Sequence, residues 1–77
     1  MTKEMIVMLE QFENRYDDIK GSPRDNEIKT LRMSALMTDM ETAFQIPIYG
    51  IERIEAFKRA FPEVFSFYRE VSYARAI

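Results

Sequence analysis

Apolar residues recur at spacings of three and four positions along most of the chain, and this spacing restricts the fold more than any other feature. One face of an α-helix has this period, whereas a half-buried strand would alternate apolar and polar residues. No stretch alternates in that way while being rich in Val, Ile and Thr,. The chain has 77 residues, which is the size of one domain, so we expect residues 1–77 to form a single domain,. The sequence therefore predicts a single all-α domain.

The first helix is expected from Lys3 to Lys20, and a short turn follows it. Its apolar face consists of Met5, Leu9, Phe12, Tyr16 and Ile19. Gly21 is placed to cap this helix in the left-handed conformation, and Ser22 before Pro23 is typical of the start of a second helix,. A turn this short makes the two helices antiparallel neighbours, so we expect an N-terminal αα-hairpin.

The second helix is expected from about Pro23 to Phe44, and it carries two apolar stripes. The first stripe consists of Ile28, Leu31, Ala35 and Ala43, with Leu36 beside it. The second stripe, called the Met stripe below, consists of Met33, Met37, Met40 and Phe44. A surface helix needs only one apolar stripe. We therefore expect this helix to pack on two sides, either between the first and third helices or against another chain.

The segment from Gln45 to Gly50 ends the second helix, because Pro47 moves Ile46 away from the helical region and Gly50 adds a second break,. Large apolar residues are concentrated in this loop, which is unusual for a connection. Two interpretations are open. The loop folds over the end of the bundle, or it is an exposed strip for recognition.

The pattern is helical again from Ile51 to Ile77, with Pro62 inside it. The residues that keep the spacing across the proline are Ile54, Phe57, Phe61, Val64, Tyr68 and Val71. Either the helix kinks at Pro62, or Pro62 begins a new helix after a tight turn. The unbroken phase favours nearly collinear segments. The expected architecture is a three-helix bundle whose third helix is kinked or split at Pro62.

A chain of this length forms a small core, and such domains usually need additional stabilisation. The sequence contains no Cys and no His, which excludes disulfides and Cys/His metal sites,. It also contains 6 Phe and 4 Tyr, more aromatic surface than a three-helix monomer would easily bury. We therefore expect a homodimer, joined through the Met stripe or through a C-terminal aromatic surface. The residues of this predicted interface are Met33, Met37, Met40, Phe44, Phe65, Phe67 and Tyr73. The alternative is a monomer in which the two stripes are the two faces of a central helix.

The same residues lead to a functional hypothesis. We expect a protein–protein interaction or regulatory module that pairs with itself or offers an apolar groove, lined by the Met stripe, to another protein. Flexible Met side chains suit surfaces that accept partner helices.

The alternative function is that of a small DNA-associated transcriptional regulator. Cations and aromatic rings alternate in the C-terminal segment: Arg53, Lys58, Arg59, Arg69 and Arg75 with Phe61, Phe65, Phe67, Tyr68 and Tyr73. Aromatic stacking and Arg contacts are a means of binding a nucleic-acid strand. Carboxylates are interspersed in the same segment, and the net charge of the chain is −2. We therefore expect these rings to pack in the core and nucleic acid not to be the partner.

The sequence offers little for catalysis. Its Ser residues have no His to activate them, and 2 Gly cannot form a phosphate-binding loop,. Glu10, Glu13 and Asp17 share one helix face and are interpreted as a solvated acidic surface rather than a Mg²⁺ or Ca²⁺ site,. We therefore expect no enzyme activity, no catalytic residue, no cofactor and no metal.

Two charged residues of the second helix, Arg32 and Asp39, fall within its apolar arc and are expected to be buried. Glu10, Glu13 or Asp17 on the first helix are the expected partners of Arg32,. Charges recur too often for a membrane span, and the N-terminus lacks the apolar region of a secretory signal,. These observations, with the absence of Cys, predict a location in the cytoplasm without membrane contact,.

The second half of the chain resembles small uncharacterised all-α proteins of Gram-positive bacteria or their phages. The resemblance is carried by the segments Leu-Met-Thr-Asp-Met-Glu (36–41), Ile-Pro (46–47), Pro-Glu-Val (62–64) and Tyr-Arg-Glu-Val-Ser-Tyr-Ala-Arg (68–75). It implies a bacterial source and no particular activity.

Overall fold

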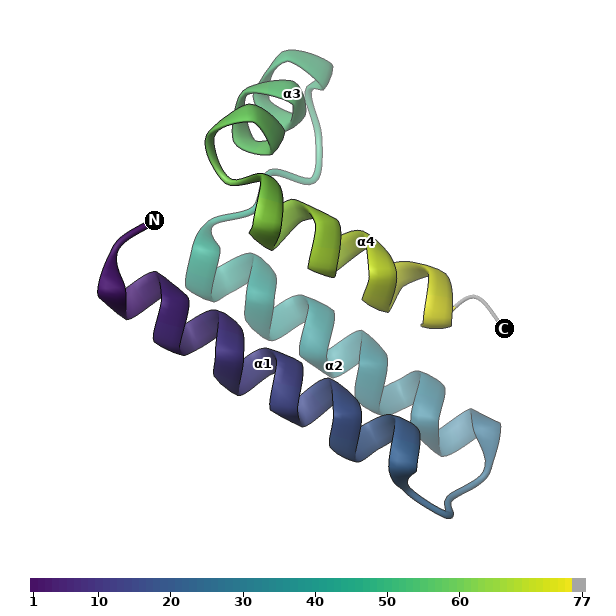
Figure 1. Cartoon of the computed structure of the whole chain (residues 1–77). Coiled ribbons are helices and arrows are strands. Elements are labelled where there is room, and N and C mark those ends of the chain that lie inside the picture. Colours follow the sequence, from purple (N-terminus) through teal and green to yellow (C-terminus); the bar gives the residue numbers. More distant parts are fainter. Residues whose placement is uncertain (76–77) are drawn as a thin grey trace.

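The computed structural model of the chain describes residues 1–75, which form four α-helices and no strand (Figure 1). The helices are α1 (Lys3–Gly21), α2 (Asn26–Phe44), α3 (Ile51–Ala60) and α4 (Pro62–Arg75). The predicted all-α class is confirmed. The last residues of the predicted third helix, 76–77, lie outside the described part. None of the described helices has the length and apolar content needed to cross a membrane.

The central helix of the fold is α2, which packs on both α1 and α4. These three helices lie side by side, with α2 antiparallel to the other two (Figure 1). The predicted αα-hairpin is therefore present. Among the described helices, α3 packs only on α4, and it projects from one end of the bundle (Figure 1). The predicted three-helix bundle is not confirmed in its count, because the last helical segment is split at Pro62 and supplies two helices, α3 and α4.

The core fills the space between α1, α2 and α4. Leu36 and Met40 of α2 and Val64 and Val71 of α4 are completely buried. The α1 residues predicted for its apolar face are all buried or packed against this core: Met5, Leu9, Phe12, Tyr16 and Ile19. Complete burial of an apolar side chain contributes about 1.5–3 kcal/mol to stability. The three-and-four spacing thus identified the buried side of α1 correctly.

The turn between α1 and α2 differs in detail from the expected one. Gly21 is the last residue of α1 and has no left-handed conformation, so the predicted glycine cap is wrong. The second helix begins at Asn26, not Pro23, because Asp25 is its N-cap: the Asp25 carboxylate accepts a hydrogen bond of 3.0 Å from the Ile28 N–H. Asp is among the best N-cap residues, so it takes this role from Ser22.

The end of α2 is fixed by a residue in the left-handed conformation. Gln45 has φ 54° and ψ 48°, and the following Ile46 N–H donates a hydrogen bond of 3.1 Å to the Glu41 carbonyl. This turn directs Ile46 into the core, where it is buried. The chain then runs outward through Ile48 and Tyr49, both exposed, to α3.

The break between α3 and α4 is a single residue, Phe61, with φ −134° and ψ 65°. Pro62 follows as the first residue of α4, the helical position that a proline tolerates best,. Because a residue before proline avoids helical angles, the chain changes direction sharply here (Figure 1),. Of the two alternatives at Pro62, the new helix is the one observed, and the expectation of nearly collinear segments is wrong.

The first apolar stripe of α2 is buried only in part: Leu36 beside it is completely buried and Ile28 is half-buried. Leu31 is 66 % exposed, and Ala35 and Ala43 are also exposed. The neighbours α1 and α4 both contact the side of α2 that carries the Met stripe, so one wide buried arc serves both of them. The remaining arc of α2 faces outward.

The expected burial of Arg32 and Asp39 is wrong for the same reason, since both lie on the outward arc and are exposed. Asp39 accepts a hydrogen bond of 2.6 Å from the Arg15 guanidinium of α1. The ion pair between α1 and α2 is thus formed by Arg15 of α1 and not by Arg32 of α2. Within residues 1–75, Arg32 forms no ion pair with the carboxylates that we expected.

A polar contact joins α2 to α4 at the edge of the core. The Tyr68 hydroxyl donates a hydrogen bond to the Glu41 carboxylate, and both side chains are partly buried. Burial, and then this hydrogen bond, raise the pKa of the Tyr68 hydroxyl well above its usual value. The folded chain therefore favours the protonated tyrosine more than the unfolded chain does.

This raised pKa makes stability depend on alkaline pH. An unfolded tyrosine ionises near pH ~10, so the contribution of Tyr68 is complete below that pH and is lost as the pH rises through the folded pKa. We expect the melting temperature of Tyr68→Phe to fall less than that of the wild type between about pH 9 and about pH 11, as measured by circular dichroism. The exposed Tyr49→Phe is the matched control and should keep the wild-type decline. An unchanged decline in Tyr68→Phe would contradict this assignment.

Candidate functional site

The predicted interface along the Met stripe lies in the core. Met33, Met37, Met40 and Phe44 are all buried within the single chain. Phe44 packs edge-to-face on Phe12 of α1, with ring centroids 5.7 Å apart. The stripe as a whole is packed, so the prediction that it lines an open groove is wrong, although Met33 borders a hollow at one end of it. Its position agrees with the alternative interpretation, in which it is a packed face of the central helix.

The predicted C-terminal surface is divided between two faces of α4. Phe67 is buried and packs edge-to-face on Tyr16 of α1, with ring centroids 5.5 Å apart. Phe65 is half-buried and Tyr73 is exposed, and both line the opposite side of the helix, toward α3. Of the three aromatic residues, only Phe65 and Tyr73 are accessible to a partner.

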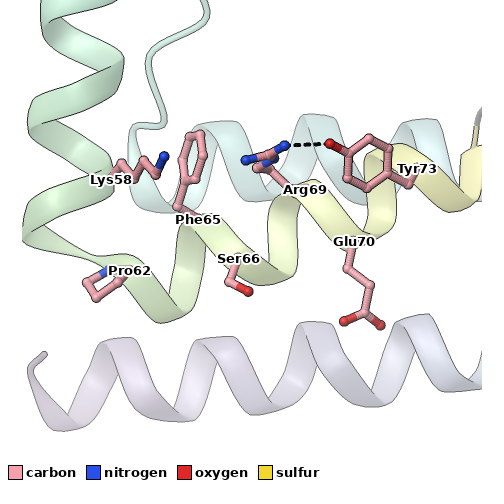
Figure 2. A pocket seen from close by; sticks show the side chains of 7 residues that line it. All are labelled: Lys58, Pro62, Phe65, Ser66, Arg69, Glu70 and Tyr73. Carbon is pink, nitrogen blue, oxygen red and sulfur yellow. Dashed lines mark hydrogen bonds between the residues drawn. The ribbon is translucent and has the colours of Figure 1, made fainter.

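A hollow of about 480 Å³ lies in the corner between α3 and α4. It is lined by Lys58, Pro62, Phe65, Ser66, Arg69, Glu70 and Tyr73. Figure 2 shows Lys58 reaching from α3 toward the Phe65 ring, while the Arg69 guanidinium donates a hydrogen bond to the Tyr73 hydroxyl. The corner thus combines an apolar floor with two cations and one carboxylate.

The inner side of this corner is an aromatic joint. Phe57 of α3 packs against Phe61 and Phe65, with ring centroids 5.2 Å and 6.5 Å away. Tilted aromatic pairs at these distances contribute about 0.5–1.5 kcal/mol beyond their burial. The Phe65 ring therefore helps to hold α3 against α4. It is only half-buried, so part of it remains exposed.

Three large apolar side chains that lie close together in the sequence are exposed in the loop after α2 and at the first residue of α3. We call this surface the apolar end, and its residues are Ile48, Tyr49 and Ile51. Met1 before α1 and Ile6 and Val7 in its first turns are also exposed. Ile51 is 81 % exposed and Tyr49 is 77 % exposed. Single exposed apolar residues are common, but a gathering of them marks an interaction surface.

The loop between α2 and α3 combines the two interpretations that its sequence left open. Ile46 folds over the end of the core, whereas Ile48 and Tyr49 are presented to solvent. The sequence reasoning missed Ile6, Val7 and Ile51 as surface residues. One signal pointed to this region: Thr42–Ile51 contains no charged residue and is the longest such run in the chain.

The acidic residues give no sign of a metal centre. Glu10, Glu13 and Asp17 are exposed along α1. Across residues 1–75, no three carboxylates lie close enough together to hold a metal ion.

The chain was compared with protein-family models, with curated proteins and with solved structures. None of these comparisons gives a match. The resemblance to small Gram-positive or phage proteins therefore stays a prediction, and the geometry of the surface is the basis for a functional assignment.

Proposed function

We propose that this chain is a protein–protein interaction module that forms a homodimer through its apolar end. The observation that carries the proposal is the exposure of Ile48, Tyr49 and Ile51, which follow one another in the loop after α2 and at the start of α3. Burying such side chains between two molecules removes apolar surface from water, which is the main driving force of association. Aromatic and large aliphatic residues also dominate the central contacts of protein interfaces.

A second copy of the chain suits this surface better than a strongly charged partner does. The uncharged run Thr42–Ile51 lets two identical surfaces approach without opposed like charges,. Charges of both signs follow the apolar end directly, with Glu52 and Arg53 on α3. In a two-fold contact the same surface of each copy faces the other, so a cation of one copy can pair with a carboxylate of the second copy.

The test is the molar mass in solution, measured by light scattering at concentrations from about 1 μM to about 1 mM, where dimers of moderate affinity assemble. We expect the wild type to become a dimer and Ile51→Glu to remain a folded monomer, because the glutamate would be buried between the two copies. Ile51 is exposed in the single chain, so its replacement should leave the helix content unchanged,.

Leu31→Glu is the matched control, because it places the same charge on an exposed apolar residue in the first half of α2, whereas the apolar end follows the last residue of that helix. It should dimerise like the wild type. A wild type that is monomeric throughout the series would overturn the proposal. If Leu31→Glu weakened dimer formation as much as Ile51→Glu, the apolar end would not be the contact surface.

The alternative function, a DNA-associated regulator, has less support. The α3–α4 corner brings Lys58 and Arg69 together, but Glu70 lies beside them. A nucleic-acid surface needs several cations without interspersed carboxylates, because phosphate contacts supply most of its affinity. A band shift that disappears steeply with added salt would favour this alternative.

A further inference from the structure

A second hollow of about 410 Å³ lies where the end of α1, the start of α2 and the end of α4 meet. It is lined by Tyr16, Lys20, Asn26, Lys29, Thr30, Met33 and Ala74. It is separate from the apolar end and from the α3–α4 corner, with which it shares no lining residue. Its volume falls within the range of about 300–1,000 Å³ that small-molecule sites occupy.

The charged side chains that line this hollow are both cations. The described lining contains the ammonium groups of Lys20 and Lys29 and no carboxylate, although the whole chain has a net charge of −2. Lys29 Nζ donates a hydrogen bond of 3.2 Å to the Lys20 carbonyl, which holds Lys29 at the end of α1. The nearest compensating carboxylate for Lys20 is Asp17, at 3.8 Å. Two cations therefore line one opening, and carboxylates lie outside its lining. Burial raises the pKa of the Tyr16 hydroxyl, Lys20 lowers it, and the carboxylates of Glu70 and Asp17 raise it.

The inner wall of the hollow is apolar. Met33 and Tyr16 are buried core residues, and Ala74 packs against the same core. Lys20 Nζ lies 4.5 Å from the centre of the Tyr16 ring, so this ammonium group is held over an aromatic face,. Asn26 and Thr30 of α2 complete the lining with neutral hydrogen-bonding groups. An apolar wall with a few polar groups at the opening is the usual design of a site for a small amphiphilic molecule.

We propose that this hollow binds a small organic anion, a monocarboxylate with an aliphatic chain, whose carboxylate lies between Lys20 and Lys29 and whose chain lies against Met33. Two ammonium donors match a carboxylate in charge and in hydrogen bonding. The aliphatic chain gains by leaving water for the wall of Met33, Tyr16 and Ala74. The proposal does not depend on the homodimer, because the apolar end shares none of these residues.

Octanoate is the probe for this site, and the methyl group of Met33 is the reporter. The chain contains 6 Met, so ¹³C-methyl-methionine labelling gives a small set of NMR signals. We expect a saturable shift of the Met33 signal during titration, while the completely buried Met40 signal changes little. Affinity should rise from butyrate to octanoate by up to about fourfold for each added methylene that is buried. Octan-1-ol, which lacks the charge, should bind much more weakly.

Lysine variants identify the site. Lys29→Gln and Lys20→Gln should each weaken octanoate binding by about tenfold or more, the usual loss when a charged hydrogen bond is removed. Lys29→Arg keeps the charge and should retain most of the affinity. Lys58→Gln, in the α3–α4 corner, is the matched control and should bind like the wild type. The absence of a saturable Met33 shift would overturn the proposal, and so would equal affinity for octan-1-ol or equal weakening by Lys58→Gln.

Discussion

Replacement of Met37 by glutamate is expected to unfold the chain. Met37 is buried in the core between the three packed helices, so the new carboxylate would have no cation and no water around it. Burying an unpaired charge costs several kcal/mol, and a domain of this size has a total stability of only about 3–5 kcal/mol. Far-ultraviolet circular dichroism at neutral pH should show the loss of most of the helix signal.

Ala35→Glu is the matched control, because it lies on the same helix and faces outward. An exposed alanine-to-glutamate change costs only a few tenths of a kcal/mol in helix propensity, so this variant should stay folded. The comparison also separates two interpretations of the Met stripe. If Met37→Glu stayed folded and only lost the ability to bind a partner, the Met stripe would be an exposed interface. That result would contradict its burial in the core.

Phe67→Ala is expected to have the second largest effect on stability. Removing a buried phenylalanine costs about 3–5 kcal/mol, because the transfer energy is lost and a cavity remains. Loss of the edge-to-face contact with Tyr16 adds to this cost,. For a domain of this length, the melting temperature should fall by at least about 12 °C, or the chain should fail to fold. A thermal melt followed by circular dichroism measures the change.

The neighbouring Phe65→Ala separates the two faces of α4. Phe65 is only half-buried and contacts Phe57 of α3, so its loss should loosen α3 and lower the melting temperature much less. If both variants lost the same stability, Phe65 and Phe67 would belong to one buried surface. That result would contradict the division of the predicted C-terminal interface between the core and the α3–α4 corner.

Helical spacing predicted the buried residues well where one apolar stripe meets its neighbours. The face of α1 around Leu9, Tyr16 and Ile19 is buried as expected, and Val64 and Val71 keep the same role in α4. Spacing states which residues share a side of a helix, because the period of 3.6 residues is fixed by backbone geometry. This part of the fold therefore follows from the sequence.

Spacing does not state which side of a helix meets a neighbour. The stripe with Leu31 and Ala35 also has helical spacing, yet α1 and α4 both pack on the side of α2 that carries the Met stripe. The choice depends on the combined volume of all three helices, and alanines cost little when they remain exposed. The direction of α3 was missed for a similar reason, since the conformation of the single residue Phe61 decides it.

The candidate surfaces were harder to predict than the core. In the sequence, nothing distinguishes Tyr49 and Ile51 from apolar residues of the core. They are exposed because of the path that the loop takes after Ile46. The hollow at Lys20 and Lys29 joins residues from both sides of the first turn to Ala74 at the end of α4. Such a site depends on tertiary packing, which no local pattern contains.

The attachment of α3 to α4 alone gives this helix a thermodynamic independence that the other helices lack. Opening of α3 breaks the aromatic joint and withdraws Phe57 from the core, while the packing among α1, α2 and α4 remains, so its free energy of opening is smaller than that of global unfolding,. Ile51 begins this helix, and any contact made there with the closed form pulls the opening equilibrium toward closure by mass action,. Association at the apolar end therefore favours the closed position of α3 against α4, and closure of α3 favours association in turn.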